Sequence, residues 1–204
     1  MEIGISLLTG YLLGTLNPAA FFAKMKKVNL KETGTKNLGA SNATIVLGRS
    51  YGAIVMVFDI FKAYLSAKIA KWLFPQLTIA WCLAGLGAVI GHVFPFYMHF
   101  QGGKGLAAFG GMVCAYNPWV LMFYLTVGVA LMLLFNYSVF LPIFASVTFP
   151  ILVLVQTGDW ATFAVCALTG LLITWRHWGN IGRIRRGEEK PVREVFATKV
   201  FNRK

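Results

Sequence analysis

Residues 119–135 read WVLMFYLTVGVALMLLF, seventeen positions without a single charge. An apolar run that approaches twenty residues is typical of a helix that crosses a lipid bilayer. A porin-like barrel would instead alternate apolar and polar residues. Similar runs recur along the 204-residue chain, which is 57% hydrophobic and only 13% charged, unlike a soluble domain. The sequence therefore predicts an all-α polytopic membrane protein, with residues 1–204 forming a single domain.

We expect seven transmembrane helices, with the N-terminus outside and the C-terminus in the cytoplasm. In chain order the predicted spans are Ile3–Ala23, Tyr51–Phe74, a span within Leu77–Phe100, Leu106–Tyr116, Trp119–Phe135, Val139–Val155 and Trp160–Trp175. Asn17 and Pro18 lie late in the first span and are expected to bend it. No basic region precedes that span, so we expect it to be retained rather than cleaved as a signal peptide.

The positive charge is confined to particular loops. The net charge is +12, and 16 of the 19 basic residues fall in segments that this topology places inside. The segments placed outside contain no Lys or Arg. This asymmetry is the positive-inside pattern of membrane proteins, whereas a soluble nucleic-acid binder spreads basic residues over a folded surface. The topology also brings every polar, glycine-rich segment to one face of the membrane.

The first candidate site is Gln101-Gly102-Gly103-Lys104-Gly105, which we call the glycine–lysine loop. Glycines allow successive backbone N–H groups to converge on one point, and such a nest beside a helix start binds anions. Lys104 adds a full positive charge. The pattern indicates a phosphate site. The alternative is a loop of small residues whose lysine reaches toward the membrane surface.

A second polar segment, residues 34–42, reads GTKNLGASN. Asparagine, serine and threonine side chains donate to phosphate oxygens, but they also cap helix starts. Both interpretations stay open here: the segment binds a phosphate, or Ser41 or Asn42 simply caps the second span.

Three further features have competing interpretations. Asp59 and Lys62 lie three residues apart on one helix face, and charges within a span normally pair inside the bundle. We therefore favour a structural ion pair over a substrate-facing role. His92 is interpreted more readily as a packed, hydrogen-bonded residue than as a base, and Ser138 as a cap of the sixth span.

The chain after Trp175 reads RHWGNIGR at 176–183 and GEEK at 187–190. If the last helix continues, His177 and Asn180 share one face, and Arg183 lies one turn further on. An imidazole, an amide and a guanidinium together suit recognition of a polyol phosphate. The alternative is an interfacial helix end whose basic residues contact lipid head groups. The sequence contains no metal-ligand spacing.

Three motifs in this order resemble those of the bacterial acyl-phosphate:glycerol-3-phosphate acyltransferase family. They are GTKNLGASN (34–42), GHVFPF (91–96) with FQGGKG (100–105), and RHWGNI (176–181) with GEEK (187–190); Asp59 and Lys62 match a further family pattern. The resemblance implies a seven-helix integral enzyme without metal, coenzyme A or other cofactor. Such an enzyme transfers a fatty acyl group from acyl phosphate to the 1-hydroxyl of glycerol 3-phosphate, giving lysophosphatidic acid and phosphate. We expect a monomer in the bacterial cell membrane with a cytoplasmic active site, acting in phospholipid biosynthesis.

The resemblance also implies roles for individual residues. Lys104, His177 and Asn180 are expected to carry the chemistry. The expected substrate-binding residues are Thr35, Lys36, Asn37, Gly39, Asn42, His92, Gly102, Gly103, Gly105, Ser138 and Arg183. Because acyl phosphate is already activated, the protein needs to supply only donors and positioning. We expect the substrate's own phosphate, rather than His177, to remove the proton, because no acidic residue lies within motif reach of that imidazole to orient it.

The chain departs from the family pattern mainly in its first motif. Ile45 stands where the family has an arginine, and either Lys36 or Arg49 is available to replace that charge. Other departures are Thr35 for serine, Lys36 for glycine, and Gln101 and Asn136 for usual basic residues. Two alternatives therefore stay open: a transporter or lipid-binding paralogue without transferase activity, or an acyltransferase for another polyol phosphate.

Overall fold

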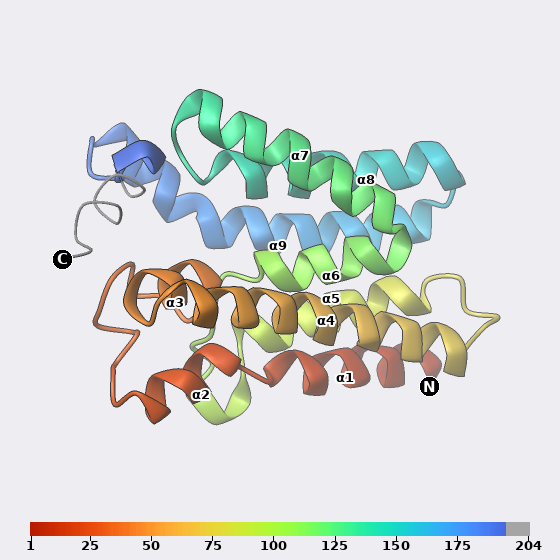
Figure 1. The fold of residues 1–204 in the computed structure, drawn as a ribbon. Coiled ribbons are helices and arrows are strands. Elements are labelled where there is room, and N and C mark those ends of the chain that lie inside the picture. Colours follow the sequence, from red (N-terminus) through yellow and green to blue (C-terminus); the bar gives the residue numbers. More distant parts are fainter. Residues whose placement is uncertain (195–204) are drawn as a thin grey trace.

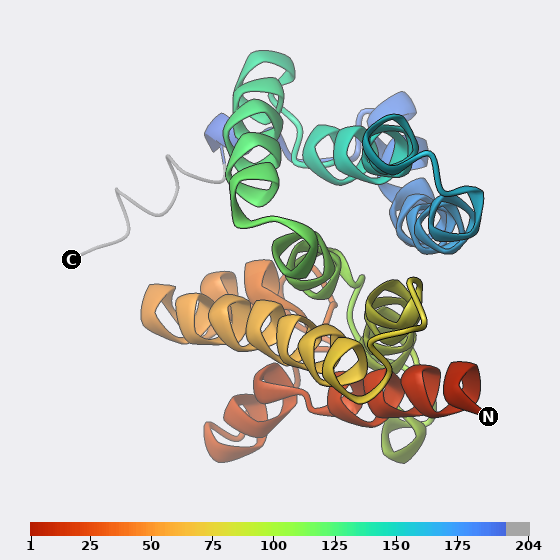
Figure 2. The same ribbon diagram turned by 90° about the vertical axis from the view of Figure 1, so that its right-hand side faces the viewer.

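The computed structural model describes residues 1–194 as a bundle of helices (Figures 1 and 2). In chain order the elements are α1 (Glu2–Thr15), α2 (Pro18–Met25), α3 (Ala40–Val46), α4 (Arg49–Leu73), α5 (Ala80–Val93), the short 3-10 helix η1 (Phe96–Met98), α6 (Leu106–Tyr116), α7 (Pro118–Phe135), α8 (Phe140–Thr157) and α9 (Trp160–Arg185). The predicted basic tail includes Lys199, Arg203 and Lys204, which lie outside the described residues.

Helix α6 joins two groups of helices. On one side α1, α4 and α5 pack together, and on the other α8 packs with both α7 and α9 (Figure 2). α6 itself contacts α4, α5, α7 and α9. The main core cluster crosses this junction: Phe109 of α6 packs edge-on against Phe149 of α8 with ring centroids 5.7 Å apart, and Val89 and Ile173 belong to the same cluster.

The closest helix pair, α1 and α5, is built from small residues. Gly10 and Gly14 of α1 lie against the backbone of Ala84 and Ala88 on α5, and Gly87 lies in turn against the backbone of α1. A methyl group at any of the three glycines would collide with that backbone. In lipid, helices gain little from hiding apolar surface, so close backbone approach through small residues is a main source of association.

Large apolar side chains cover the outside of the bundle, as expected for a protein surrounded by lipid. Exposed examples on several helices are Leu8, Phe21, Val57, Leu134, Val155 and Leu171. The interior instead holds polar groups such as Ser6, Thr162 and Thr169. A contiguous apolar surface of this extent would be a liability in water. The chain is therefore an all-helical membrane protein.

Within residues 1–194, four helical segments are both long and apolar enough to cross a membrane: Glu2–Met25, Ala80–Met98, Pro118–Phe135 and Phe140–Thr157. Helix α6 has only 11 residues, and so rises about 16 Å. Helices α4 and α9 are longer, with 25 and 26 residues, but α4 contains Asp59 and Lys62 and α9 ends in arginines. The count of seven spans therefore stays a prediction.

Most of the predicted boundaries are close to the observed ones. The fourth predicted span coincides with α6, and the fifth and sixth differ from α7 and α8 by one or two residues. The first predicted span is divided, because the Asn17 side chain accepts a hydrogen bond from the Ala20 N–H at 2.9 Å and begins α2 anew. α9 continues past Trp175 to Arg185, as the third motif required.

Two predicted helix caps are wrong. Ser41 and Asn42 lie inside α3, a short helix that the sequence pattern did not predict, and α4 starts after Gly48 without a side-chain cap. Likewise α8 starts after Val139 without a side-chain cap, so Ser138 does not cap it. In both places a backbone turn, rather than a hydroxyl or amide, begins the helix.

The polar segments gather at one end of the bundle (Figure 1). The connection from α2 to α3 and the C-terminal end of α9 lie at this end, whereas the N-terminus and the α4–α5 and α8–α9 connections lie at the opposite end. Hydrogen bonds described below join the segments at the first end. This arrangement agrees with the alternation of spans predicted from the charge pattern.

Candidate functional site

The glycine–lysine loop begins with a sharp reversal of the chain. His99 and Phe100, which precede it, have φ values of 54° and 56°, in the left-handed region that non-glycine residues rarely adopt. Gly105, which ends the loop, has a φ of 86° and is the N-cap of α6. Such conformations cost about 1–3 kcal/mol each for non-glycine residues and persist only where surrounding contacts enforce them.

The reversal brings the loop back to the C-terminal end of α5. The Gly102 N–H donates to the Val93 carbonyl at 2.9 Å, and the Gly103 N–H donates to the His92 carbonyl at 3.1 Å. These two donors therefore close the loop internally. They are therefore not free to bind a ligand. A ligand would instead meet the Lys104 side chain and the partial positive charge at the N-terminus of α6, which begins directly after the loop.

Gly103 is the point of closest approach between the loop and its surroundings. A Cβ at this position would collide with the His92 ring and lie 2.8 Å from the Leu38 carbonyl oxygen. Nearby, Lys31 Nζ donates to Gln101 Oε1 at 3.2 Å. The first and second motifs are therefore in direct contact, although more than sixty residues separate Leu38 from Gly103.

A chain of hydrogen bonds joins Lys104 to the third motif. Lys104 Nζ donates to Asn180 Oδ1 at 2.5 Å, Asn180 Nδ2 donates to Glu189 Oε1 at 2.6 Å, and Arg183 Nε donates to Glu189 Oε2 at 2.6 Å. We call these four residues the Lys104 cluster. Asn180 and Arg183 share a face because α9 continues through both of them.

Arg176 and His177 complete the site from the preceding turn of α9. Arg176 Nη2 donates to the Gly103 carbonyl at 3.3 Å, while its Nε is buried and, in the described part of the chain, has no hydrogen-bond partner. The Nδ1 of His177 lies 2.8 Å from the Ile173 carbonyl. A carbonyl can only accept, so Nδ1 carries the proton and Nε2 keeps a free lone pair.

The electrostatics of the site favour an anion. Burial, and then repulsion from Arg183, lower the pKa of Lys104 to about 8, against the opposing effect of Glu189. Burial lowers the pKa of His177 to about 4, although its bond to Ile173 opposes that change. At neutral pH the site thus holds Lys104, Arg176 and Arg183 as cations against the single carboxylate of Glu189. A bound phosphate would balance this excess.

Asn42 has its amide engaged within the first motif. Its Oδ1 accepts from the Thr35 N–H at 2.7 Å, and its Nδ2 donates to the carbonyls of Leu30 at 2.9 Å and Thr33 at 3.1 Å. The residue is completely buried. In this structure Asn42 holds the segment before α3 in place, and a direct contact with substrate stays a prediction.

The other predicted residues of the first motif lie nearer the surface. Thr35 and Lys36 are exposed, and Lys36 has a φ of 55°. Asn37 is half-buried, with its side chain next to Gly39, the N-cap of α3. Ile45 lies on α3 with its side chain partly exposed. The structure places this motif beside the glycine–lysine loop, and its substrate contacts stay predictions.

Ser138 lies apart from the Lys104 cluster in the hydrogen-bond network of the described residues. It is exposed in the turn between α7 and α8. The neighbouring Asn136 holds the chain that follows Glu189: its carbonyl accepts from the Val192 N–H at 2.8 Å, and its Oδ1 accepts from the Arg193 N–H at 3.0 Å. Thus the α7–α8 turn anchors the segment that carries Glu189.

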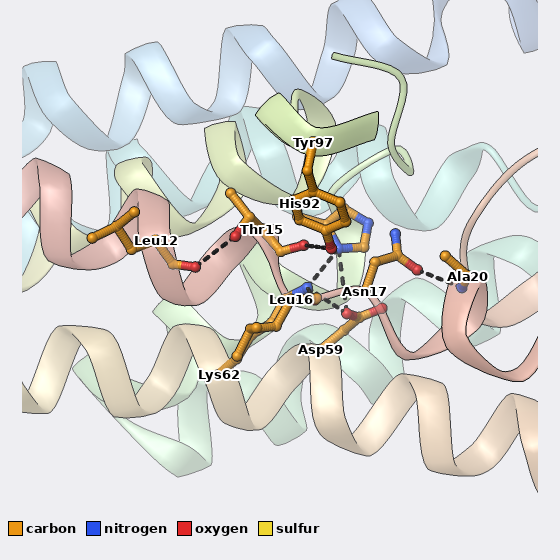
Figure 3. A network of polar contacts seen from close by, with 9 residues as sticks. All are labelled: Leu12, Thr15, Leu16, Asn17, Ala20, Asp59, Lys62, His92 and Tyr97. Atoms are coloured by element: carbon orange, nitrogen blue, oxygen red, sulfur yellow. Dashed lines mark hydrogen bonds and ion pairs between the residues drawn. The ribbon is translucent and has the colours of Figure 1, made fainter. Parts of the chain in front are cut away.

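The predicted ion pair between Asp59 and Lys62 is confirmed. Lys62 Nζ lies 2.7 Å from Asp59 Oδ1, and His92 joins the pair in the core (Figure 3). We call these three residues the Asp59 network. His92 is buried, as expected for a packed histidine, but its backbone and ring both contact the glycine–lysine loop.

Two residues of the site were not among the predicted ones. Arg176 and Glu189 both belong to the third motif, but spacing alone did not distinguish Glu189 from Glu188. The structure separates them: Glu188 pairs with Arg186 at the surface, at 2.8 Å, whereas Glu189 turns inward. The motif itself was a sufficient signal for Arg176, which directly precedes His177.

A model of the glycerol-3-phosphate acyltransferase family matches residues 4–187. The chain belongs to the glycerol-3-phosphate acyltransferase family. Relatives of that name include one from Coxiella burnetii (strain CbuG_Q212), 35% identical over 95% of this chain and 100% of the relative. Another, from Listeria monocytogenes (strain EGD-e), is 34% identical over 95% of this chain and 99% of the relative. A third, from Lactiplantibacillus plantarum, is 36% identical over 94% and 93%.

Solved structures agree with this assignment. The chain resembles crystal structures of PlsY, an integral membrane glycerol 3-phosphate acyltransferase, in a glycerol 3-phosphate form and a lysophosphatidic acid form. The TM-scores are 0.87 and 0.86 at 31% identity, and the matches cover 94% and 96% of this chain and 96% and 99% of the PlsY chains. The family inferred from the three motifs is thereby confirmed: the chain is a membrane acyltransferase of the kind used in phospholipid biosynthesis.

Proposed function

We propose that this protein transfers a fatty acyl group from acyl phosphate to the 1-hydroxyl of glycerol 3-phosphate, giving lysophosphatidic acid and inorganic phosphate. The observation that carries the proposal is the positive site made where Lys104 meets Asn180, Arg176 and the α6 N-terminus. Donor and acceptor both carry phosphate, and both match a site with surplus cations. The relatives named above support glycerol 3-phosphate as the acceptor.

The reaction requires charge stabilisation rather than a protein nucleophile. The 1-hydroxyl oxygen attacks the acyl carbonyl carbon, the bond from that carbon to the phosphate oxygen breaks, and phosphate leaves with the bonding electrons. Negative charge develops on the carbonyl oxygen and on the departing phosphate. Lys104 and Arg176 are placed to stabilise that charge, because preorganised donors are most effective in a site shielded from water.

The proton of the attacking hydroxyl passes to a substrate phosphate. A phosphate ester has its second pKa at about 6, whereas His177 has a pKa of about 4 and is the weaker base. The neutral ring of His177 keeps the Nε2 lone pair free to accept a hydrogen bond from a hydroxyl group. We therefore assign His177 to orienting the acceptor.

The proposal includes an arrangement in the membrane. Seven spans with an external N-terminus put the glycine–lysine loop and the third motif on the cytoplasmic side of the cell membrane. The gathering of polar segments at one end of the bundle supports this orientation, as does the concentration of basic residues in those segments. We propose that the protein works as a monomer, since the Lys104 cluster is built within one chain.

The test uses the purified full-length protein in detergent with palmitoyl phosphate and radiolabelled glycerol 3-phosphate. We expect labelled lysophosphatidic acid and release of one phosphate for each product formed, and no product when palmitoyl-CoA replaces palmitoyl phosphate. Failure to form product in a folded sample would refute the proposed function. Product with another polyol phosphate alone would indicate a different acceptor. Binding of labelled glycerol 3-phosphate without product would indicate a transporter or lipid-binding paralogue.

A further inference from the structure

The Asp59 network, drawn in Figure 3, contacts the glycine–lysine loop through His92 and has no part in the reaction steps described so far. Asp59, Lys62 and His92 are each at most 3% exposed. Lys62 Nζ contacts Asp59 Oδ1 at 2.7 Å and donates to the Leu16 carbonyl, at the end of α1, at 2.6 Å. The network thus joins α1, α4 and α5, and the two charges of α4 balance each other.

Lys62 determines where His92 carries a proton. Lys62 Nζ lies 3.0 Å from Nδ1 of His92. Because an ammonium group has only donors, Nδ1 must accept, and the neutral ring then carries its proton on Nε2. Nδ1 also lies 3.3 Å from Asp59 Oδ1, but an N–H at Nδ1 would face the ammonium group of Lys62. The arrangement in which Nδ1 accepts is therefore favoured, and in it Nε2 is the hydrogen-bond donor.

That donor faces the site. A Cβ on Gly103 would collide with Nε2 of His92, so this nitrogen lies directly against the glycine–lysine loop. Within residues 1–194 it has no hydrogen-bond partner, whereas Nδ1 is engaged by Lys62. A donor that has no protein partner and lies against the glycine–lysine loop is well placed to meet a ligand oxygen.

We propose that His92 donates from Nε2 to the phosphate of the acyl donor held by the glycine–lysine loop, and that Lys62 is the positioning residue that keeps the proton on Nε2. This inference rests on the proposed function, because it assigns one contact of the same substrate. The Asp59 network then does more than join helices: the buried charges of Asp59 and Lys62 fix the direction in which the neutral His92 ring donates.

Two variants of His92 separate the proposed contact from a purely structural role. Glutamine places an amide N–H2 near the position of Nε2 and can still reach the loop. Asparagine places its amide oxygen near Nδ1 and can still accept from Lys62, but offers nothing at Nε2. We expect His92→Gln to keep the KM for palmitoyl phosphate within about threefold of wild type, and His92→Asn to raise it about tenfold or more, with little change in the KM for glycerol 3-phosphate.

Only a KM for palmitoyl phosphate that is raised in His92→Asn and nearly unchanged in His92→Gln supports the inference. If His92→Asn is active and His92→Gln is not, the ring serves Lys62 alone and the proposal is overturned. Equal loss in both variants, or no loss in either, overturns it as well. Thermal unfolding in detergent accompanies each assay to show that the variants are folded.

A measurement on the wild-type protein decides the matter if either variant does not fold. With 15N-labelled histidine, addition of inorganic phosphate is expected to move the Nε2–H signal of His92 and not that of Nδ1; an unmoved signal overturns the inference. The two proposals also fail separately. A protein that binds phosphate through His92 but makes no lysophosphatidic acid refutes the function alone. An active wild type with another pattern of variants refutes this inference alone.

Discussion

Among the described residues, the buried Asp59 network and the partly buried Lys104 cluster are two groups of charged residues that differ in how well their charges are matched. In the Asp59 network one lysine faces one aspartate at 2.7 Å and also reaches a backbone carbonyl. In the Lys104 cluster, together with Arg176, three cations face one carboxylate, and the Arg176 Nε has no partner among the described residues. The charges of the first group balance each other and those of the second do not, although one buried polar atom in each, Asp59 Oδ1 and Arg176 Nε, has no hydrogen-bond partner among the described residues.

The difference separates anchoring from binding. Two matched buried charges anchor helices to one another. Removal of one partner destabilises the fold because the other charge is then buried without a partner. A site with surplus cations is instead completed by an anionic ligand. Removal of one of these cations lowers the rate of catalysis. Gly103 links the two groups, because it lies against the His92 ring and its carbonyl accepts from Arg176. Substitutions away from this link can be chosen to affect mainly one group.

Loss of Lys104 should have the largest effect. Lys104→Ala removes the cation nearest the reacting phosphate, and we expect kcat/KM to fall about a thousandfold while the unfolding temperature changes little. The matched control is Lys68→Ala on α4, whose Nζ donates to the Ala115 carbonyl at the opposite end of the bundle. Its activity should equal that of wild type. Retained activity in Lys104→Ala would contradict the assigned role.

The Asp59 network should show its largest effect on stability. Lys62→Met leaves Asp59 as a buried charge without its partner, and we expect the free energy of unfolding to fall by about 3–5 kcal/mol. The double variant Asp59→Leu with Lys62→Met removes both charges and should recover most of that loss. Thermal unfolding in detergent measures both. A single variant as stable as wild type would show that the pair does not anchor the helices.

Gly103→Ala tests the contact between the two groups. The added methyl group collides with the His92 ring and crowds the Leu38 carbonyl, so the loop must shift. A displacement of about 1 Å near a reacting group lowers rates by up to about a hundredfold, and we expect a loss of that order in kcat/KM. Gly4→Ala is the control, because no atom lies within 4 Å of a Cβ there. Equal activities in both variants would argue against a closely packed loop.

The pH dependence follows from Lys104. This side chain is charged below its pKa of about 8 and neutral above it, so kcat/KM, which reports the free enzyme, should fall about tenfold per pH unit above pH 8. His177, with a pKa of about 4, stays neutral from pH 5 to 8 and should add no inflection near 6.5. Lys104→Arg should move the alkaline limb to higher pH; a limb unchanged in this variant would assign it to another group.

The smallest expected effect concerns the departure at Ile45. This side chain is partly exposed on α3, so an arginine fits there without disturbing the core. Ile45→Arg adds a cation to the first motif, and we expect the KM for glycerol 3-phosphate to fall by about threefold, the equivalent of one exposed charge interaction. Arg49→Ala and Lys36→Ala, measured in parallel, show whether either residue already supplies that charge. If the KM for glycerol 3-phosphate rises in Ile45→Arg, the acceptor does not bind next to this part of the first motif.

Much of the fold was accessible from sequence because apolar runs and helix breakers are local signals. The bounds of the helix Leu106–Tyr116 were predicted to the residue, and a bend was expected at Asn17 and Pro18, where the structure divides the first predicted span. Helix α3 escaped prediction, since seven residues carry too little periodicity to distinguish a helix from a polar loop. Capping by Ser41 or Asn42, left open as an alternative, and by Ser138 is wrong for a related reason: a hydroxyl or amide near a helix start does not reveal which turn of backbone begins the helix.

The sequence by itself determined the membrane class, the order of the three motifs and the gathering of polar segments at one end, because hydropathy and charge act along the chain. Only the tertiary structure decided which groups meet. It turned Glu189 inward and left Glu188 outside, committed the Asn42 amide to its own loop, and placed Nε2 of His92 against Gly103. These outcomes depend on directions of side chains from different helices, and such directions are fixed by packing between segments far apart in sequence.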